Sequence, residues 1–176
     1  MDLKKLDRCD ILLYKGTGFT SKLIQWGTTS LYSHVALVVN PEMCLGIESN
    51  TGHQSGVRAI DLRKIENGTV DVFRIKTEFK FNGDEVISFL VDHLGAKFDF
   101  VGVTWLGVLK GVSAFTGFKK LKMFNQFQEA KDYFCSELVY EAFSAGGLDI
   151  VPQVDEADIT SPGDIAQSDR LNPIVV

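Results

Sequence analysis

The stretch Asp132-Tyr-Phe-Cys-Ser-Glu-Leu-Val-Tyr-Glu-Ala-Phe143 is predicted to form a helix with a cysteine in its first turn. Asp132 is of the type that caps a helix by accepting hydrogen bonds from free backbone N–H groups. Gly146-Gly147 provides the stop. On a helical wheel Cys135 falls in the apolar stripe, and a helix start favours a thiolate. Two interpretations follow: a small buried hydrophobe, or a reactive thiol that needs a histidine from elsewhere.

Length, charge and cysteine content restrict the class of protein. We expect a single domain over residues 1–176, which is long enough to bury a proper core. A net charge of −5 and the lack of a basic stripe argue against a nucleic-acid binder. The three cysteines form no CxxC pair, which argues against a disulfide framework or a structural zinc site. We see no signal peptide and no membrane-spanning run, so we expect a cytoplasmic protein, with virus or phage origin as an open alternative.

Several segments have the apolar and β-branched content of strands, and short turns separate them. They are residues 10–14, 32–39, 44–49, 57–62 and 70–75. Consecutive strands with short turns predict an antiparallel meander. Helical patterns cover residues 19–26 and 84–94. Together with the cysteine helix, these segments predict an α+β fold.

An insertion rich in aromatic residues and glycine occupies about residues 98–131. We expect it to form a loop with helical pieces that covers the core. The alternative is a lid or a lipid-contacting segment, because Lys119, Lys120 and Lys122 directly follow its aromatic part. In that case residues 98–122 would make peripheral contact with a membrane.

A reactive Cys135 needs a base, and the chain has three histidines. His53 lies in a polar loop and His93 on a charged helix, where both are expected to be solvated. His34 lies among the apolar residues of the strand at 32–39, where an ionisable group is costly without a partner. His34 is therefore the predicted base.

Glu48 is the predicted partner of His34. If the turn after the strand centres on Pro41, residues 34 and 48 lie directly opposite each other on one face of the sheet. A slip of one residue would place Ser49 opposite His34 instead. Loop residues would then replace Glu48, namely Asn50 or Gln54.

Three segments carry a resemblance to a known family: Ser33-His-Val-Ala-Leu-Val38, Gly46-Ile-Glu-Ser49 and Tyr133-Phe-Cys-Ser-Glu-Leu-Val139. Their order, a histidine, then an acid, then a cysteine at a helix start, resembles the circularly permuted papain-like enzymes of the NlpC superfamily. The YiiX-like group is the most similar, and it is distantly related to lecithin retinol acyltransferase-like enzymes. Weaker similarities at 94–100 and 160–165 extend the resemblance over nearly the whole chain.

The resemblance implies a papain-like fold, in which an antiparallel sheet or barrel packs against the nucleophile-bearing helix. It implies Cys135 as nucleophile, His34 as general base and Glu48 as orienting acid, with no metal or organic cofactor. Tyr133 resembles a tyrosine that lines such sites and is expected to contact substrate. Phe98 departs from the family, which often has tyrosine there, so the edge of the pocket should differ.

Four functional hypotheses remain open. The first is a peptidase or amidase that cleaves an amide bond through a thioester. The second is a lipid-directed thiol acyltransferase or phospholipase, which lipid vesicles should activate. The third is a non-catalytic binding module on the same fold. The fourth is a zinc site formed by Cys135, His34 and Cys44, which lacks a local pair of ligands.

Overall fold

The computed structural model describes residues 1–18, 21–22, 25–26, 29–51, 55–97, 134–154 and 160–176. The strands are β1 (Ile11–Tyr14), β2 (His34–Asn40), β3 (Leu45–Asn50), β4 (Gly56–Asp61), β5 (Val70–Ile75) and β6 (Leu171–Ile174). The helices are α2 (Gly83–Asp92), α4 (Cys135–Ala145) and α5 (Pro162–Ala166), with short 3-10 helices η1 (Leu3–Lys5) and η2 (Leu62–Lys64). The predicted strands and the helix predicted at 84–94 are present, with slightly shifted ends. Of the helix predicted at 19–26, residues 21–22 and 25–26 are described and helical.

The strands form one six-stranded antiparallel sheet in the order β4-β3-β2-β1-β5-β6. Strands β1 to β4 form the predicted meander. The meander prediction is wrong at the next step, because β5 pairs with the free edge of β1 and not with β4. This pairing sets Val72 opposite Leu12 and Phe73 opposite Ile11, so that all four side chains are buried. The free energy gained by burying these apolar side chains between β5 and β1 therefore outweighs the advantage of pairing β5 with β4, the strand before it in the sequence.

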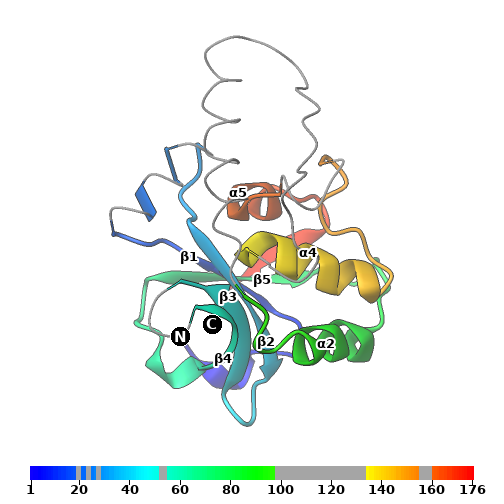
Figure 1. Ribbon diagram of the computed structural model, residues 1–176. Helices are drawn as coiled ribbons and strands as arrows, with labels where there is room; N and C mark the ends of the chain where they lie inside the picture. The colour runs from blue at the N-terminus through cyan, green and yellow to red at the C-terminus, as the bar shows by residue number, and fades with distance from the viewer. Residues whose placement is uncertain (19–20, 23–24, 27–28, 52–54, 98–133, 155–159) are drawn as a thin grey trace.

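Both faces of the sheet are covered by apolar side chains. One face packs against α2 and α4, which lie side by side on it (Figure 1). The opposite face holds a smaller cluster of buried residues: Leu6, Leu12, Ala36, Val38, Leu62 and Val72. Because each face is covered, β1 and β2 are apolar at nearly every position and do not alternate with polar residues.

The C-terminal part of the chain contains a strand that the sequence pattern did not predict. Residues 160–165 were predicted to form a turn into a terminal segment, and their resemblance to the family implies entry into a C-terminal strand. In the structure α5 is followed by β6, which pairs with β5 at the edge of the sheet. Pro173 lies within β6 and lacks an N–H, which an edge strand tolerates. Because proline is unfavourable inside most strands, the sequence pattern around Pro173 did not predict one.

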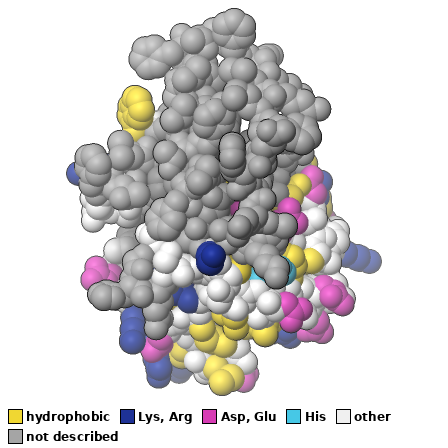
Figure 2. All heavy atoms as spheres, viewed as in Figure 1, with side chains coloured by type: hydrophobic (Ala, Val, Ile, Leu, Met, Phe, Trp, Pro, Cys, Tyr) yellow, Lys and Arg dark blue, Asp and Glu magenta, His cyan; other side chains and the backbone are white. Residues whose placement is uncertain are grey.

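The described surface has mixed charge on the face drawn in Figure 2. Acidic and basic side chains are interspersed there, with apolar side chains between them. That face therefore offers no basic stripe among the described residues. No helix in the described part of the chain is long and apolar enough to cross a bilayer. The predicted insertion at 98–131 lies outside the described residues.

Candidate active site

The first residue of β2 and the middle of β3 bring His34 and Glu48 into contact. Nε2 of His34 lies 2.6 Å from Oε2 of Glu48, which is only 4% exposed. The predicted direct opposition of these residues is wrong, because the cross-strand partner of Glu48 is Ala36. The register is shifted by two residues, so His34 and Glu48 stay on one face and meet diagonally.

The turn between β2 and β3 explains this register. Pro41 is the first residue of the turn and not its centre, since its carbonyl accepts from the N–H of Cys44 at 3.1 Å. The side chain of Asn40 accepts from the N–H of Met43 at 2.9 Å, and Cys44 has a left-handed φ of 55°. The pairing also shifts between Val38 and Asn40. Such an irregularity is not visible in the apolar pattern of the strand.

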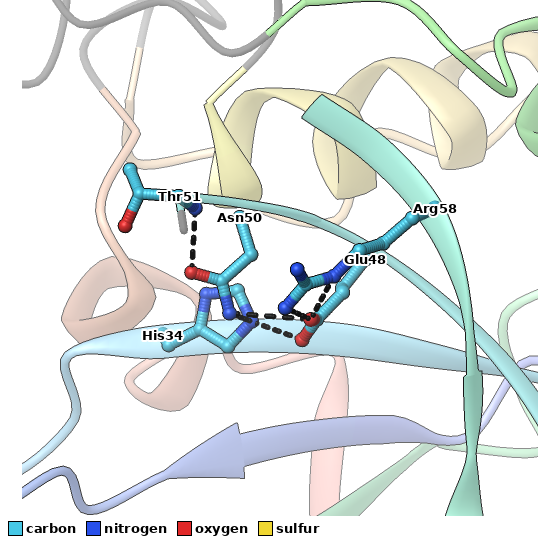
Figure 3. A network of polar contacts seen from close by, with 5 residues as sticks. All are labelled: His34, Glu48, Asn50, Thr51 and Arg58. Carbon is cyan, nitrogen blue, oxygen red and sulfur yellow. Dashed lines mark hydrogen bonds and ion pairs between the residues drawn. The ribbon is translucent and has the colours of Figure 1, made fainter. Parts of the chain in front are cut away.

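Arg58 and Asn50 donate to the second oxygen of Glu48 (Figure 3). Nε and Nη2 of Arg58 lie 3.0 and 2.7 Å from Oε1, and Nδ2 of Asn50 lies 3.2 Å from it. Burial raises the pKa of Glu48, but the hydrogen bond and charge of His34, with Arg58 and Asn50, lower it to about 2. Glu48 is therefore ionised at neutral pH.

An ionised Glu48 determines the tautomer of His34. Carboxylate oxygens only accept hydrogen bonds, so the contact with Oε2 requires a hydrogen on Nε2. Nδ1 is then the ring nitrogen that remains for Cys135. Nδ2 of Asn50 lies 3.4 Å from Nε2, but both atoms are donors, so Asn50 supports Glu48 and not the ring.

Cys135 and His34 interact where the start of α4 meets the start of β2. Burial lowers the pKa of His34, but the charge of Cys135 and a hydrogen bond with it, together with Glu48, raise it to about 9. Cys135 is the first residue of α4 and is 7% exposed. The structure thus brings the three predicted site residues together.

The first turn of α4 is anchored on both sides of Cys135. The N-cap residue is the buried Phe134, so the predicted cap at Asp132, which lies outside the described residues, is wrong. The N–H of Phe134 donates to Oε2 of Glu137 at 3.4 Å. The hydroxyl of Ser136 donates to the carbonyl of Thr160 at 2.7 Å. These contacts fix the direction in which the helix start points.

A cavity of about 640 Å³ opens beside His34 and Glu48. His34, Glu48 and Arg58 form part of its wall, and residues 59–61 and 64–66 form another part. Tyr14 of β1 also lines the cavity, and its ring centroid lies 5.1 Å from that of His34. Burial, together with the charge of Glu48, raises the pKa of the Tyr14 hydroxyl. His34 therefore contacts Cys135 and also lines this cavity.

Of the remaining candidate residues, the structure describes His93. Tyr133, His53 and Gln54 lie outside the described residues. Nδ1 of His93 lies 2.7 Å from the carbonyl of Phe89 within the same helical region, and the rings are stacked.

The zinc hypothesis is not supported by the positions of its three residues. Cys135, His34 and Cys44 are all described, and no group of three or more His, Cys, Asp or Glu side chains suited to a metal occurs in the described part of the chain. In addition, Nε2 of His34 is already bound by Glu48.

Sequence reasoning missed Arg58 and Tyr14. Both lie in strands that were predicted, and both are polar residues within mostly apolar segments. Tyr14 faces His34 through the β1–β2 pairing, and Arg58 faces Glu48 through the β3–β4 pairing. A charged residue inside a predicted strand was the available signal, but its partner depends on a register that the sequence leaves open.

These elements define an α+β fold of the YiiX-like class. The predicted fold class is confirmed, including the antiparallel sheet, the helix with Cys135 and the order in which the histidine strand precedes that helix. Among solved structures, the chain is similar to the metalloprotein YiiX from Escherichia coli O157:H7. The identity is 16%, the TM-score is 0.65, and the match covers 96% of each chain. A scan of family models and a search of curated proteins found no match.

Proposed function

We propose that this chain is a cysteine-dependent hydrolase or acyl-transfer enzyme that acts on amide bonds, as papain-like enzymes of the NlpC superfamily do. One observation carries the proposal. The Cys135 side chain interacts with an imidazole whose pKa is raised to about 9, while the other ring nitrogen is held by Glu48. A nucleophile, a base and an orienting acid within hydrogen-bonding reach are the arrangement that covalent hydrolases use.

The proposed reaction is an acyl transfer. Nδ1 of His34 takes the thiol proton of Cys135, and Sγ attacks the carbonyl carbon of the substrate. The first backbone N–H groups of α4 have no acceptor within the helix, so they are suited to stabilise the oxyanion. The C–N bond breaks as His34 gives its proton to the leaving amine. Water or another acceptor, deprotonated by His34, then attacks the thioester and releases the acyl group, which restores the thiol.

Glu48 supports this reaction without exchanging protons. Its pKa of about 2 keeps it ionised, so it stabilises the imidazolium and holds the hydrogen on Nε2. Nδ1 is therefore the nitrogen that faces the sulfur, and it carries the proton taken from the thiol.

A metal is not required in this proposal, although YiiX is described as a metalloprotein. The donor set of the described residues does not fit a metal ion, because it contains no suitable group of three or more His, Cys, Asp or Glu side chains. The lipid-directed hypothesis depends on residues 98–122, which lie outside the described residues.

The test is the pH dependence of Cys135 alkylation by iodoacetamide, followed by intact mass and peptide mapping. Wild type is compared with His34→Ala, and Cys9 and Cys44 serve as internal controls. Cys9 is a useful slow control, because burial raises its pKa to about 11. We expect Cys135 to be labelled fastest, to remain reactive below pH 7, and to slow by about tenfold or more without His34.

Labelling of Cys135 no faster than that of the control cysteines would reject the proposed nucleophile. Fast labelling that is the same in His34→Ala would reject the proposed base. With selective labelling established, a panel of peptide amides and N-acyl amides defines the substrate. A Cys135→Ala variant is the blank for every assay.

A further inference from the structure

Arg58 and Glu48 face each other directly across β3 and β4. Two donors of Arg58, Nε at 3.0 Å and Nη2 at 2.7 Å, converge on the single oxygen Oε1. The other oxygen, Oε2, lies 2.6 Å from Nε2 of His34. The carboxylate is therefore held at one oxygen by a guanidinium and at the other by the imidazole, which fixes its rotation.

Another buried carboxylate in this sheet is bound differently. Asp10, which is fully buried, receives Nε of Arg74 on Oδ1 at 2.7 Å and Nη2 on Oδ2 at 2.8 Å. That fork occupies both oxygens, as a stabilising arginine–carboxylate pair commonly does. Arg58 instead leaves Oε2 of Glu48 for His34. The difference indicates that Arg58 has a role in orienting the site.

The surroundings of Glu48 make a permanent positive charge important. Glu48 is 4% exposed, and an isolated carboxylate in such a position is costly. Among the described residues, Tyr14 from β1, His34 from β2 and Arg58 from β4 are ionisable side chains that interact with it. A tyrosine hydroxyl is neutral and an imidazole can lose its proton, whereas a guanidinium stays charged.

We propose that Arg58 is a positioning residue of the Cys135 site, which holds Glu48 ionised and oriented so that Nδ1 of His34 faces the sulfur. This inference rests on the proposed function of the site. Arg58 acts through Glu48, and Glu48 acts through the tautomer and orientation of the His34 ring.

The experiment compares Arg58→Gln and Arg58→Lys with Arg74→Gln, the matched control at the other buried carboxylate. Three properties are measured: the Glu48 carboxyl titration by ¹³C NMR, the His34 tautomer by ¹⁵N NMR, and the pH profile of Cys135 alkylation. In Arg58→Gln we expect the Glu48 midpoint to rise by about one to two pH units. We also expect alkylation at pH 7 to slow by about tenfold, and the neutral His34 ring, observed above its pKa of about 9, to become a mixture of tautomers.

Arg58→Lys should separate charge from geometry. A lysine keeps the charge but does not present two fixed donors to one oxygen. We expect its Glu48 midpoint to stay near the wild-type value while alkylation slows by about threefold. Arg74→Gln should lower the melting temperature and leave the site properties unchanged.

An Arg58→Gln protein that melts earlier but keeps the wild-type Glu48 midpoint and His34 tautomer would overturn the inference. If Arg58→Gln does not fold, Arg58→Lys becomes the test. Alkylation of Cys135 at the wild-type rate in Arg58→Lys would then overturn the inference. Failure of the proposed function gives a different result. Cys135 would then label unselectively in wild type, while the NMR titrations would still report whether Arg58 controls Glu48 and His34.

Discussion

Nε2 of His34 lies 2.6 Å from Oε2 of Glu48, although Glu48 pairs across the strands with Ala36. The contact is diagonal, and the β-carbons of diagonal neighbours are about 7 Å apart. A long acidic side chain is needed to span that distance. Asn50, which lies opposite His34 if the same register continues, supports the carboxylate from the side.

The diagonal geometry predicts that Glu48→Asp behaves like Glu48→Gln. Aspartate keeps the charge but is shorter by one methylene, so it should not reach Nε2 of His34. We expect each variant to slow Cys135 alkylation at pH 7 by about tenfold, since a hydrogen bond to a charged group is lost. A Glu48→Asp variant that labels at the wild-type rate would show that the charge alone is sufficient.

Replacement of Cys135 by alanine should remove the reactivity and leave the fold nearly intact. The side chain is small and lies at the start of α4, so we expect a loss of about 1 kcal/mol or less. Without the sulfur, the pKa of His34 should fall from about 9 toward its ordinary value of 6.5. Thermal unfolding and ¹⁵N NMR measure the two effects. A large loss of stability with activity retained would instead identify Cys135 as a core residue.

The low pKa of Glu48 predicts a specific acid sensitivity. The folded-state pKa of about 2 lies below the ordinary 4.5, so the stabilisation is present above pH 4.5 and is lost as the pH falls toward 2. His34, whose pKa is about 9, stays protonated across that window. We expect the wild type to exceed Glu48→Gln in unfolding free energy by on the order of 2–3 kcal/mol at pH 5.

This difference should shrink progressively between pH 5 and pH 2, and urea unfolding at fixed ionic strength measures it. A constant difference over the whole window would mean that Glu48 stabilises the fold by packing and not by its charge.

Close packing at Gly16 predicts that a side chain at this position would shift the start of β2 and disrupt the site. A β-carbon on Gly16 would lie 2.3 Å from Oγ of Ser21 and 2.7 Å from Oγ of Ser33, the residue before His34. We expect Gly16→Ala to cost about 1–3 kcal/mol and to slow Cys135 alkylation as the start of β2 shifts. Gly18→Ala is the matched control, because a β-carbon there would meet nothing within 4 Å.

Thermal unfolding and alkylation are measured on both glycine variants. Equal effects in the two variants would show that general backbone stiffening, and not the clash with Ser21 and Ser33, is responsible.

Local patterns were sufficient to find most of the elements and the two central side chains of the site. Cys135 stands out because an amphipathic segment ends at two glycines, and helix periodicity places the thiol toward the core. His34 stands out because an ionisable residue opens an apolar strand. Both signals depend on neighbours within about four residues, which are the interactions that set helices and strands.

The sequence by itself determined most of the α+β elements and the position of Cys135 at the start of a helix. Only the tertiary structure decided the pairing of β5 with β1, the register that places Arg58 opposite Glu48, and the contact of His34 with Cys135. The physical reason is that pairing partners are chosen by burial and by turn geometry over long separations. A turn that begins at Pro41 and a shift near Val38 leave the apolar pattern unchanged, yet they decide which side chains meet.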